Sequence, residues 1–420
     1  AGGGLAVTHP MAVLPIRRIF RIVNGSTPLS GDPSFWDGDI AWVTPEDLGK
    51  LDQPLIRTTR RTLTDAGYRS CGTTLVPPGS LILTTRAPIG NLAIAGGNLC
   101  TNQGCKCLVP RVPLNSKFFY YALHAECDRL QALGQGSTFR ELSSDQLAAF
   151  EVPIVTVERQ DRIAAFLDYK TTAIDALIAK KERQIELLQE KRQALITQVA
   201  TKGLDPDVPM KESGVEWLGE IPAHWTTAPL KHLASFLNGL AFSPAEWGQE
   251  GTPIIRIENL NGGENFNFTT RVVPGMFHVK KGDILFGWSG NRGTSFGPFR
   301  WDKEGTFYLN QHIFRVLKFT ADRDWLYWCL KAVTAHVEEM AHGIIGMVHI
   351  TRGALGAIRV PVVPLEEQIS IASYLDRQFG HLERLADAHL KSIERLREYR
   401  QALISAAVTG KIEIPTEEAV

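Results

Sequence analysis

The chain has 420 residues, of which 44% are hydrophobic, and its 45 Lys and Arg balance its 45 Asp and Glu. This length predicts two or three packed domains. The balanced charge excludes a protein that binds polyanions over its whole surface, but it allows a local basic face. No apolar run approaches the ~18 residues needed to cross a membrane. Six irregularly placed cysteines are typical of a protein of the reduced cytoplasm.

The second half of the chain repeats the first. Residues 153–155 and 160–168 return as 361–363 and 368–376, and residues 192–196 return as 400–404, all at an offset of 208 residues. Asn102-Gln103 and Asn310-Gln311 keep this offset, whereas Asn24-Gly25 pairs with Asn238-Gly239 at an offset of 214. The repeat predicts two units of about 200 residues, built on one scaffold.

Two mixed globules are expected, at residues 1–155 and 204–362. In the first, short apolar runs broken by Gly and Pro predict strands at 81–83 and 92–94, and helical spacing predicts a helix over 117–133. In the second, residues 284–286 and 325–340 predict the matching strand and helix. Both globules are therefore of the α+β class.

Two long helices are expected, at 156–203 and within 363–420. In each, apolar residues recur in steps of four and three, which is typical of a coiled-coil seam. Gln160 and Gln368 stand at the helix starts, where we expect N-terminal capping or a hydrogen bond to the globule. Arg192 and Arg400 interrupt the seam at equivalent positions, where polar residues fix register at a cost in stability. The aliphatic seam residues are Leu167, Ile174, Ile178, Ile185, Leu188, Leu195, Leu375, Leu382, Ile393, Leu396 and Leu403.

The fold predicted from these patterns has two mixed α/β globules related by pseudo-twofold symmetry. Two long antiparallel coiled-coil helices pair with each other and hold the globules apart.

The sequence carries no recognisable catalytic motif. There is no Asn/Asp-Pro-Pro-Phe/Tyr segment for adenine methylation and no Gly-rich phosphate loop. His124-Ala125-Glu126 mimics the start of a zinc deaminase signature, but the Pro-Cys-x-x-Cys that should follow is missing. Cys100, Cys105 and Cys107 cluster without an evident fourth ligand. We therefore expect no catalytic residue, no metal site and no cofactor in this chain.

Several segments between residues 14 and 412 resemble the DNA-specificity (S, HsdS) subunit of Type I restriction–modification enzymes. They are the stretch from Lys211 to Trp225, Asn24-Gly25-Ser26-Thr27-Pro28, the strands at 39–43 and 253–257, Gly136-Ser137-Thr138, and Pro364-Leu365-Glu366-Glu367-Gln368. The first half departs from the family pattern, because Arg159 stands where Glu367 does and no Trp-Leu-Gly-Glu-Ile-Pro segment is present.

The resemblance implies a non-catalytic subunit with two target-recognition domains. Each domain would read one half of an interrupted double-stranded DNA site, and the helices would set the spacing. The helices would also dock two modification subunits that carry S-adenosylmethionine and methylate adenine. Whether restriction subunits, which use ATP, also join stays open.

The candidate DNA-contacting residues have side chains suited to phosphates or to base edges. They stand in loops at strand ends, where a rigid scaffold presents function. In the first globule they are Arg57, Arg60, Arg61, Arg69, Thr84, Thr85, Arg86, Asn91, Gln135, Ser137, Thr138 and Arg140. In the second globule they are Arg256, Asn259, Trp288, Ser289, Asn291, Arg292, His342, His349 and Arg352. The competing interpretation is a solvated surface whose loops have drifted neutrally.

Two other functions remain open on the sequence. The chain is alternatively a non-catalytic coiled-coil scaffold with two protein-binding globules, which duplex binding against salt distinguishes from a DNA reader. A single-chain enzyme with a site between its halves would need acids, bases or metal ligands at matching positions. The matching polar residues are instead amides.

Overall fold

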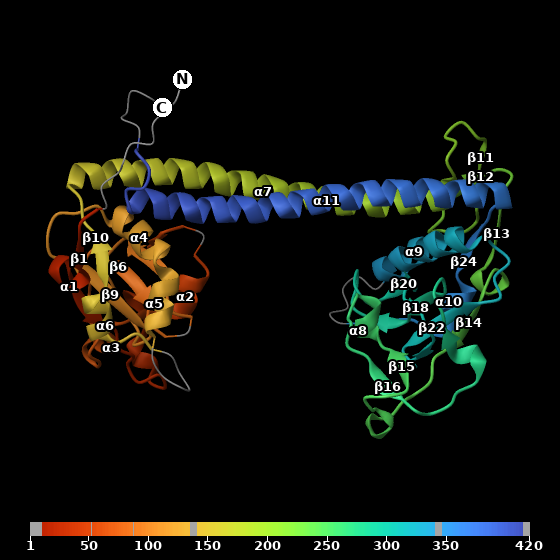
Figure 1. Ribbon diagram of the computed structural model, residues 1–420, viewed down its shortest axis with the longest axis horizontal. Helices are drawn as coiled ribbons and strands as arrows, with labels where there is room; N and C mark the ends of the chain where they lie inside the picture. Colours follow the sequence, from red (N-terminus) through yellow and green to blue (C-terminus); the bar gives the residue numbers. More distant parts are fainter. Residues whose placement is uncertain (1–10, 52, 87, 135–140, 341–346, 415–420) are drawn as a thin grey trace. The chain divides into compact units, whose positions relative to one another are not determined.

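The computed structural model describes residues 11–51, 53–86, 88–134, 141–340 and 347–414 (Figure 1). The chain forms two compact units. The first holds residues 1–181 and 391–420, and the second holds residues 182–390. Each unit therefore contains one globule together with a part of each long helix.

The first globule is built on a five-stranded sheet with the order β2-β9-β6-β7-β4. These strands are β2 (Phe20–Asn24), β9 (Cys105–Pro110), β6 (Leu81–Thr84), β7 (Leu92–Ala95) and β4 (Leu55–Ile56). A second sheet has β5 (Thr62–Leu63), β3 (Trp36–Val43) and β8 (Leu99–Thr101), and β1 (Val13–Pro15) pairs with β10 (Glu151–Pro153). The helices are α1 (Ile16–Ile19), α2 (Pro45–Gly49), α3 (Asp65–Arg69), α4 (Ser116–Ala125), α5 (Cys127–Leu133) and α6 (Ser144–Ala149), with a 3-10 turn at Pro33–Phe35.

The second globule has two four-stranded sheets. One has the order β14 (Ser235–Asn238), β22 (Ile313–Leu317), β18 (Ile284–Gly287) and β20 (Gly297–Arg300). The other has β16 (Asn267–Thr269), β15 (Thr252–Ile255), β21 (Phe307–Leu309) and β17 (His278–Val279). Three strand pairs complete it: β13 (Thr226–Pro229) with β24 (Arg359–Val362), β19 (Ser289–Gly290) with β23 (Val348–His349), and β11 (Met210–Glu212) with β12 (Glu220–Pro222). Its helices are α8 (Ile257–Leu260), α9 (Arg323–Met340) and α10 (Arg352–Ala357), with 3-10 turns at Leu230–His232, Pro244–Glu246 and Gly275–Phe277.

The sequence repeat is a repeat of topology. Strand β9 lies antiparallel between β2 and β6, as β22 lies between β14 and β18. In each globule one parallel strand pair, β3 with β8 and β15 with β21, belongs to the other sheet. The repeated glycines serve this frame, because a Cβ atom on Gly25 would lie 2.0 Å from the Asn102 carbonyl oxygen, and one on Gly239 would lie 2.1 Å from that of Asn310.

The helix predicted at 117–133 is interrupted. Helix α4 ends at Ala125, and α5 begins at Cys127. Between them Glu126 has φ −103° and ψ 14°, outside the helical range, so two helices replace the continuous one. Strands β6, β7 and β18 and helix α9 confirm the other elements predicted in the globules.

The long helices are α7 (Val157–Lys202) and α11 (Leu365–Val408). In the first unit, Ile163 and Leu167 of α7 share a core with Ile404 and Val408 of α11, above α4 (Figure 1). Further along α7, Asp175 pairs with Arg400, earlier in α11, so the two helices run antiparallel there.

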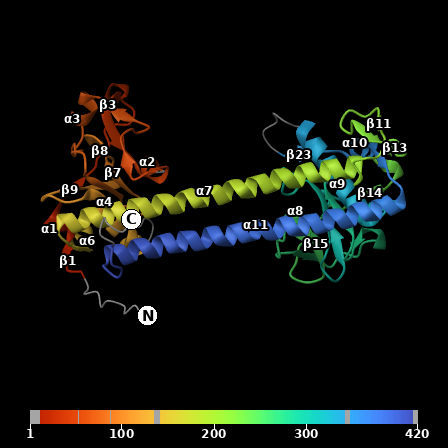
Figure 2. The ribbon, with the colours of Figure 1, turned by 90° about the horizontal axis from the view of Figure 1, so that it is seen from above.

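In the second unit the same arrangement recurs. Ile196 and Val199 of α7 share a core with Ile371 and Leu375 of α11, and both helices are seen from above in Figure 2. The predicted aliphatic seam faces inward in both units. Leu167, Ile174, Ile178, Leu375, Leu382 and Ile393 are buried, and Ile185, Leu188, Leu195, Leu396 and Leu403 are half-buried.

The arginines in the seam are compensated by acids of the opposite helix. Arg400 Nε lies 2.9 Å from Asp175, and Arg192 Nη2 lies 3.1 Å from Glu383. The two ion pairs occupy equivalent positions in the repeat. Each pair is partly solvated and therefore contributes at most about 1 kcal/mol to stability. Their geometry favours one register of the helices, which explains a charge in an apolar seam.

Gln160 and Gln368 tie each long helix to its globule, as one of the two predicted roles required. Gln160 is buried; its Oε1 accepts the Asn115 N–H at 2.8 Å and its Nε2 donates to the Val155 carbonyl at 2.9 Å. Gln368 is also buried and makes the same pair of bonds, to the Asp322 N–H at 2.6 Å and the Val363 carbonyl at 2.7 Å.

The segment found only in the second half explains the exchange of Glu367 for Arg159. The β11–β12 hairpin leads to Trp225, whose side chain is fully buried and whose Nε1 donates to Glu367 at 3.0 Å. His224 Nε2 lies 2.7 Å from the same carboxylate. Arg159, in contrast, is exposed. A carboxylate at this position therefore serves to bind the Trp225 segment, and the first half, which lacks the segment, has no need of it.

Within the described ranges, no helix has both the length and the apolar character of a membrane span.

Candidate nucleic-acid interface

Four loops of the first unit meet at one edge of the five-stranded sheet. Because β6 and β2 both run antiparallel to β9, Thr84 and Asn24 end beside the start of β9 at Cys105 and Lys106. Thr85 continues this ladder, since its N–H donates to the Gly104 carbonyl and its own carbonyl accepts from Leu142, both at 2.9 Å. Loops separated by more than 100 residues in the sequence therefore share this edge. We call Asn24, Thr27, Arg86, Gln103, Glu141 and Ser144 the first strand-end surface.

The charged groups on this surface are neutralised in part. Arg86 Nε lies 3.1 Å from Glu141 Oε2, and the two side chains are 47% and 40% exposed. Lys106 lies behind them, buried, with its Nζ 3.1 Å from Asn24 Oδ1. Burial lowers the pKa of Lys106, which Glu141 opposes and Arg86 reinforces. A guanidinium, an ammonium and one carboxylate leave the surface with a local excess of positive charge.

The second unit presents the same ladder with other side chains. The Trp288 N–H donates to the His312 carbonyl at 3.3 Å, and the Trp288 carbonyl accepts from Ile350 at 3.0 Å. Trp288 thus takes the place of Thr85. Ser289 forms an antiparallel backbone pair with His349, as Arg86 does with Glu141. We call Trp288, Ser289, Gln311, His312, His349 and Arg352 the second strand-end surface.

Aromatic and imidazole rings dominate the second surface. The Trp288 ring lies 4.7 Å from that of His349 and 5.5 Å from that of His312, measured between centroids. Arg352 is exposed in the first turn of α10 and has no ion-pair partner among the described residues. One backbone frame therefore carries an ion pair in the first unit and a cluster of rings with a separate arginine in the second.

Gln103 and Gln311 belong to these surfaces, although sequence reasoning assigned the repeated amides a structural role. Both side chains are exposed, Gln103 at the turn that leads into β9 and Gln311 at the turn that leads into β22. Thr27 donates its hydroxyl hydrogen to Gln103 Oε1. In the sequence, Gln103 and Gln311 can be recognised as identical residues at the repeat offset that stand next to loops of different sequence.

The arginines at 57–61 do not converge on the strand-end surface. Arg57 donates to the Gly96 carbonyl at 2.9 Å, Arg60 pairs with Glu46 at 2.9 Å, and Arg61 stacks 3.4 Å above the Trp36 ring. Arg69 is exposed in the last turn of α3. Among these four arginines, Arg69 alone makes no hydrogen bond, ion pair or ring contact with the described residues.

Three predicted contact residues are built into the globules. Thr84 and Thr85 are fully buried; Thr84 donates to the Pro88 carbonyl at 2.6 Å, and Thr85 donates to that of Gly104 at 3.4 Å. Asn259 is buried, and its amide donates to the Gly263 and Asn265 carbonyls. These bonds give the three side chains a structural role, and we do not retain them as DNA contacts.

The remaining predicted residues are distributed around the sheets. Asn91 is half-buried and bonded through its backbone to Thr84. Arg256 holds Asn267 at 2.7 Å and stacks 4.9 Å from the Trp247 ring. Asn291 is exposed and Arg292 is half-buried. Gln135, Ser137, Thr138, Arg140 and His342 lie outside the described residues.

The cysteines near the first sheet edge have the surroundings of core residues. Cys100, Cys105 and Cys107 are buried, and burial raises the pKa of Cys100 to about 11 and that of Cys107 to about 12. Metal ligation requires the thiolate, which these environments disfavour. Across the residues that the structure describes, no group of three or more His, Cys, Asp or Glu has the geometry to hold a metal ion.

Comparisons with known proteins agree on one family. The model of the Type I restriction modification DNA specificity domain matches residues 10–187 and again residues 222–395. The chain is 36% identical over 180 residues to the Type I restriction enzyme MjaIX specificity subunit of Methanocaldococcus jannaschii, an alignment that covers 42% of this chain and 41% of that relative. It is 23% identical over 318 residues to the MjaVIII specificity subunit of the same organism, covering 72% of this chain and 71% of the relative.

Solved structures share the fold at lower sequence identity. A chain from a structural study of complex assembly and conformational transition in the type I R-M system superposes with a TM-score of 0.75 at 16% identity, covering 98% of this chain and all of that one. The HsdS subunit from Thermoanaerobacter tengcongensis gives a TM-score of 0.55 at 16% identity and covers 96% of this chain and 97% of that one.

Proposed function

Because this chain belongs to the Type I restriction modification DNA specificity family, we propose that it is the subunit that selects the DNA sequence for a Type I restriction–modification complex. One observation carries the proposal. The two strand-end surfaces keep a common backbone ladder, while Arg86 and Glu141 in one are exchanged for Ser289 and His349 in the other. Two readers of different half-sites require such an arrangement.

In the first unit, Arg86 is the principal reading group. A guanidinium makes two parallel hydrogen bonds to guanine O6 and N7 in the major groove. Glu141 holds this guanidinium at 3.1 Å in the absence of DNA. On binding DNA, Arg86 therefore exchanges the Glu141 carboxylate for acceptors on a base. A base that accepts poorly does not compensate for the lost ion pair, so the difference in binding free energy between the right and the wrong base increases.

In the second unit, His349 and Ser289 supply the donors and acceptors. Trp288 donates its indole N–H to the Gln311 carbonyl at 2.9 Å, so its ring is held in place beside His349. Arg352 carries the free positive charge that a phosphate contact needs. We assign Arg352 the role of positioning the second globule on the DNA. The residue at the equivalent place in the first unit is the uncharged Ser144, so this contact belongs to the second unit alone.

The partners of this subunit follow from the same proposal. Its DNA target is double-stranded and bipartite, and the long helices set the spacing between the half-sites. Two modification subunits dock on the helices and carry S-adenosylmethionine, and whether restriction subunits that use ATP join the complex stays open. We expect the chain itself to be no catalyst and to bind no cofactor. Its relatives from Methanocaldococcus jannaschii are specificity subunits.

Methylation mapping tests this function. The chain is combined with a modification subunit, and methylated adenines are mapped in random DNA for the wild type and for the Arg86→Ala and His349→Ala variants. Each variant should relax a different half-site, by ~1–3 kcal/mol where a bidentate base contact is lost. Equal effects on both halves would contradict the division of labour. Duplex binding that ignores salt concentration would favour the protein-binding scaffold instead.

A further inference from the structure

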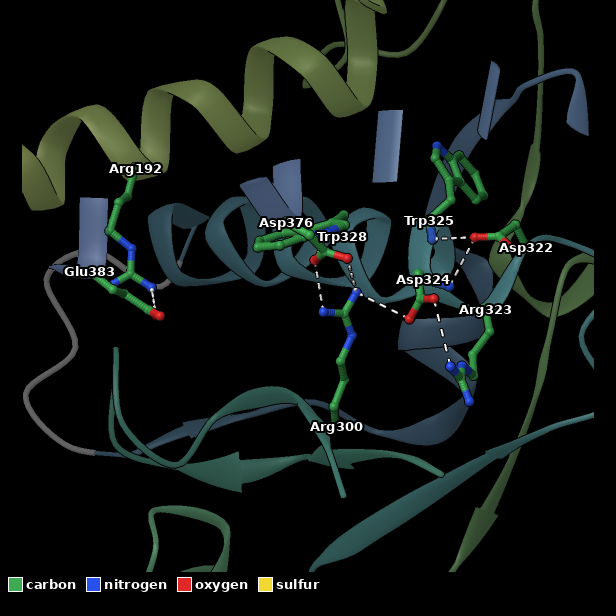
Figure 3. A network of polar contacts seen from close by, with 9 residues as sticks. All are labelled: Arg192, Arg300, Asp322, Arg323, Asp324, Trp325, Trp328, Asp376 and Glu383. Atoms are coloured by element: carbon green, nitrogen blue, oxygen red, sulfur yellow. Dashed lines mark hydrogen bonds and ion pairs between the residues drawn. The ribbon is translucent and has the colours of Figure 1, made fainter. Parts of the chain in front are cut away.

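The second unit contains an open cavity of about 690 Å³ that the DNA-reading role leaves unused. It lies between α9, strand β20 and the parts of α7 and α11 that belong to this unit. Figure 3 shows four of the charged groups around it, with Arg192 on α7, Glu383 and Asp376 on α11, and Arg300 below them. Its volume is that of a site for several side chains or a small ligand.

Two of the three cations that line the cavity already have acidic partners. Arg300 binds Asp376 at 2.8 Å and Asp324 at 3.2 Å, and Trp328 Nε1 donates to the same Asp376 at 3.0 Å (Figure 3). Arg192 binds Glu383 at 3.1 Å. These pairs hold the walls together and leave little positive charge for a ligand.

Lys331 is the third cation, and it has no such partner. Its Nζ lies 5.5 Å from the Phe299 ring and 5.6 Å from the Tyr327 ring, and within the described residues it makes no hydrogen bond or ion pair. Glu338, the acid whose charge it feels, is bonded to the Gly293 N–H at 3.0 Å. Burial, reinforced by repulsion from Arg192, lowers the pKa of Lys331 to about 8. The lysine is therefore still charged at pH 7, in a site that solvates it poorly.

The equivalent place in the first unit lacks this charge. There Tyr120 and Arg400 lie near His124 on α4, as Tyr327 and Arg192 lie near Lys331 on α9. Burial and the neighbouring Arg400 lower the pKa of His124, so its imidazole is neutral at pH 7. The repeat thus has one cationic and one neutral version of the same position.

We propose that this cavity receives a carboxylate-bearing segment of the modification subunit, with Lys331 as the ionic partner of the carboxylate. The rings of Phe299 and Tyr327 then cover the apolar part of that segment. Asp376 and Glu383 compensate Arg300 and Arg192 in direct ion pairs. Lys331 is thus the cation of the lining that no acid contacts among the described residues, and a single carboxylate matches it, whereas the acids of the walls repel a polyphosphate or a nucleic acid strand. The partner's identity rests on the proposed function, but the chemistry of the site does not.

The consequence is that two copies of one modification subunit meet unequal docking sites. The second unit offers a charge that the first lacks, so one copy binds more tightly at pH 7. Protonation of Lys331 is linked to this binding. A carboxylate raises the lysine pKa above its free value of about 8, so binding is strongest below pH 8 and weakens as the pH rises toward 9.

Calorimetry of the full-length chain with purified modification subunit tests the proposal. Lys331→Met should weaken one of the two binding events by at least about tenfold at pH 7 and leave the other unchanged. Wild-type binding at pH 8 should take up about half a proton, measured in buffers of different ionisation enthalpy, and Lys331→Met should take up none. Lys331→Arg should restore the affinity, and Lys280→Met, at an exposed lysine of the same unit, should behave as wild type.

Three results would count against the inference. Two unchanged binding events in Lys331→Met, with no proton uptake by the wild type, would overturn it while leaving the proposed function intact. Binding of free glutamate that depends on Lys331, with unchanged partner binding, would make the cavity a small-molecule site and also overturn it. A wild-type chain that binds no modification subunit would refute the proposed function itself.

Discussion

Replacing Gln368 by Met should destabilise the second unit by about 2–4 kcal/mol. The side chain is buried, and its amide bonds the Asp322 N–H at 2.6 Å and the Val363 carbonyl at 2.7 Å. Methionine has a similar length but neither donates nor accepts here, so one N–H and one C=O lose their partners. Each unsatisfied group costs ~1–3 kcal/mol, and the apolar side chain recovers part of this through burial. Gln160→Met should cost the first unit a similar amount, because its two bonds are equivalent.

Hydrogen exchange resolves the two units separately, which a single melting curve does not. The amide of Asp322 precedes α9, and a loss of 2 kcal/mol should speed its exchange about thirtyfold in Gln368→Met. Asn115 should remain as protected as in the wild type, and the pattern should reverse in Gln160→Met. Gln401→Met, at an exposed position of α11, is the matched control. A Gln368→Met protein within about 0.5 kcal/mol of this control would refute the reasoning.

Three further predictions concern recognition and the helix seam. Glu141→Gln should free Arg86 and strengthen duplex binding about threefold to tenfold, measured by fluorescence anisotropy, with some loss of discrimination in one half-site. Leu188→Asp should destabilise the helix pair by several kcal/mol, seen as lost helicity or aggregation, because the seam buries an unpaired carboxylate; a stable, normally assembling variant would place the seam in solvent. Gln103→Ala and Gln311→Ala should each weaken binding severalfold without changing the preferred sequence, which methylation mapping checks.

The long helices and the repeat were predictable because their signals are linear. Apolar residues in steps of four and three, returning at a constant offset, report the pairing of α7 with α11 without reference to any other element. Strand β6 was recognisable for the same reason, as an apolar run after a turn. The break at Glu126 was not, because the residues on both sides keep a helical pattern.

The candidate contacts were harder to predict because exposure depends on strand pairing. Thr84 and Thr85 follow a predicted strand, yet the ladder with β9 continues through them and buries both. Arg86 depends on Glu141, 55 residues away, and no local pattern shows that the two meet. The role of Glu367 was hidden for the same reason, since its indole partner Trp225 belongs to a segment that only one half contains.

The residues that are identical in the two halves divide into two classes, and the division has a functional meaning. Gln160 and Gln368 are identical because each is buried and holds two backbone groups, and Gly25 and Gly239 because a Cβ atom there would overlap a carbonyl. Structure explains these pairs completely. Gln103 and Gln311 are exposed, next to side chains that differ between the units, with Arg86 and Glu141 in one and Ser289 and His349 in the other. A residue kept by two readers of different sequences must contact what both half-sites have in common, and the sugar–phosphate backbone is common to every sequence. We therefore propose that the repeated glutamines place each globule on the duplex and that the exchanged residues beside them choose the bases.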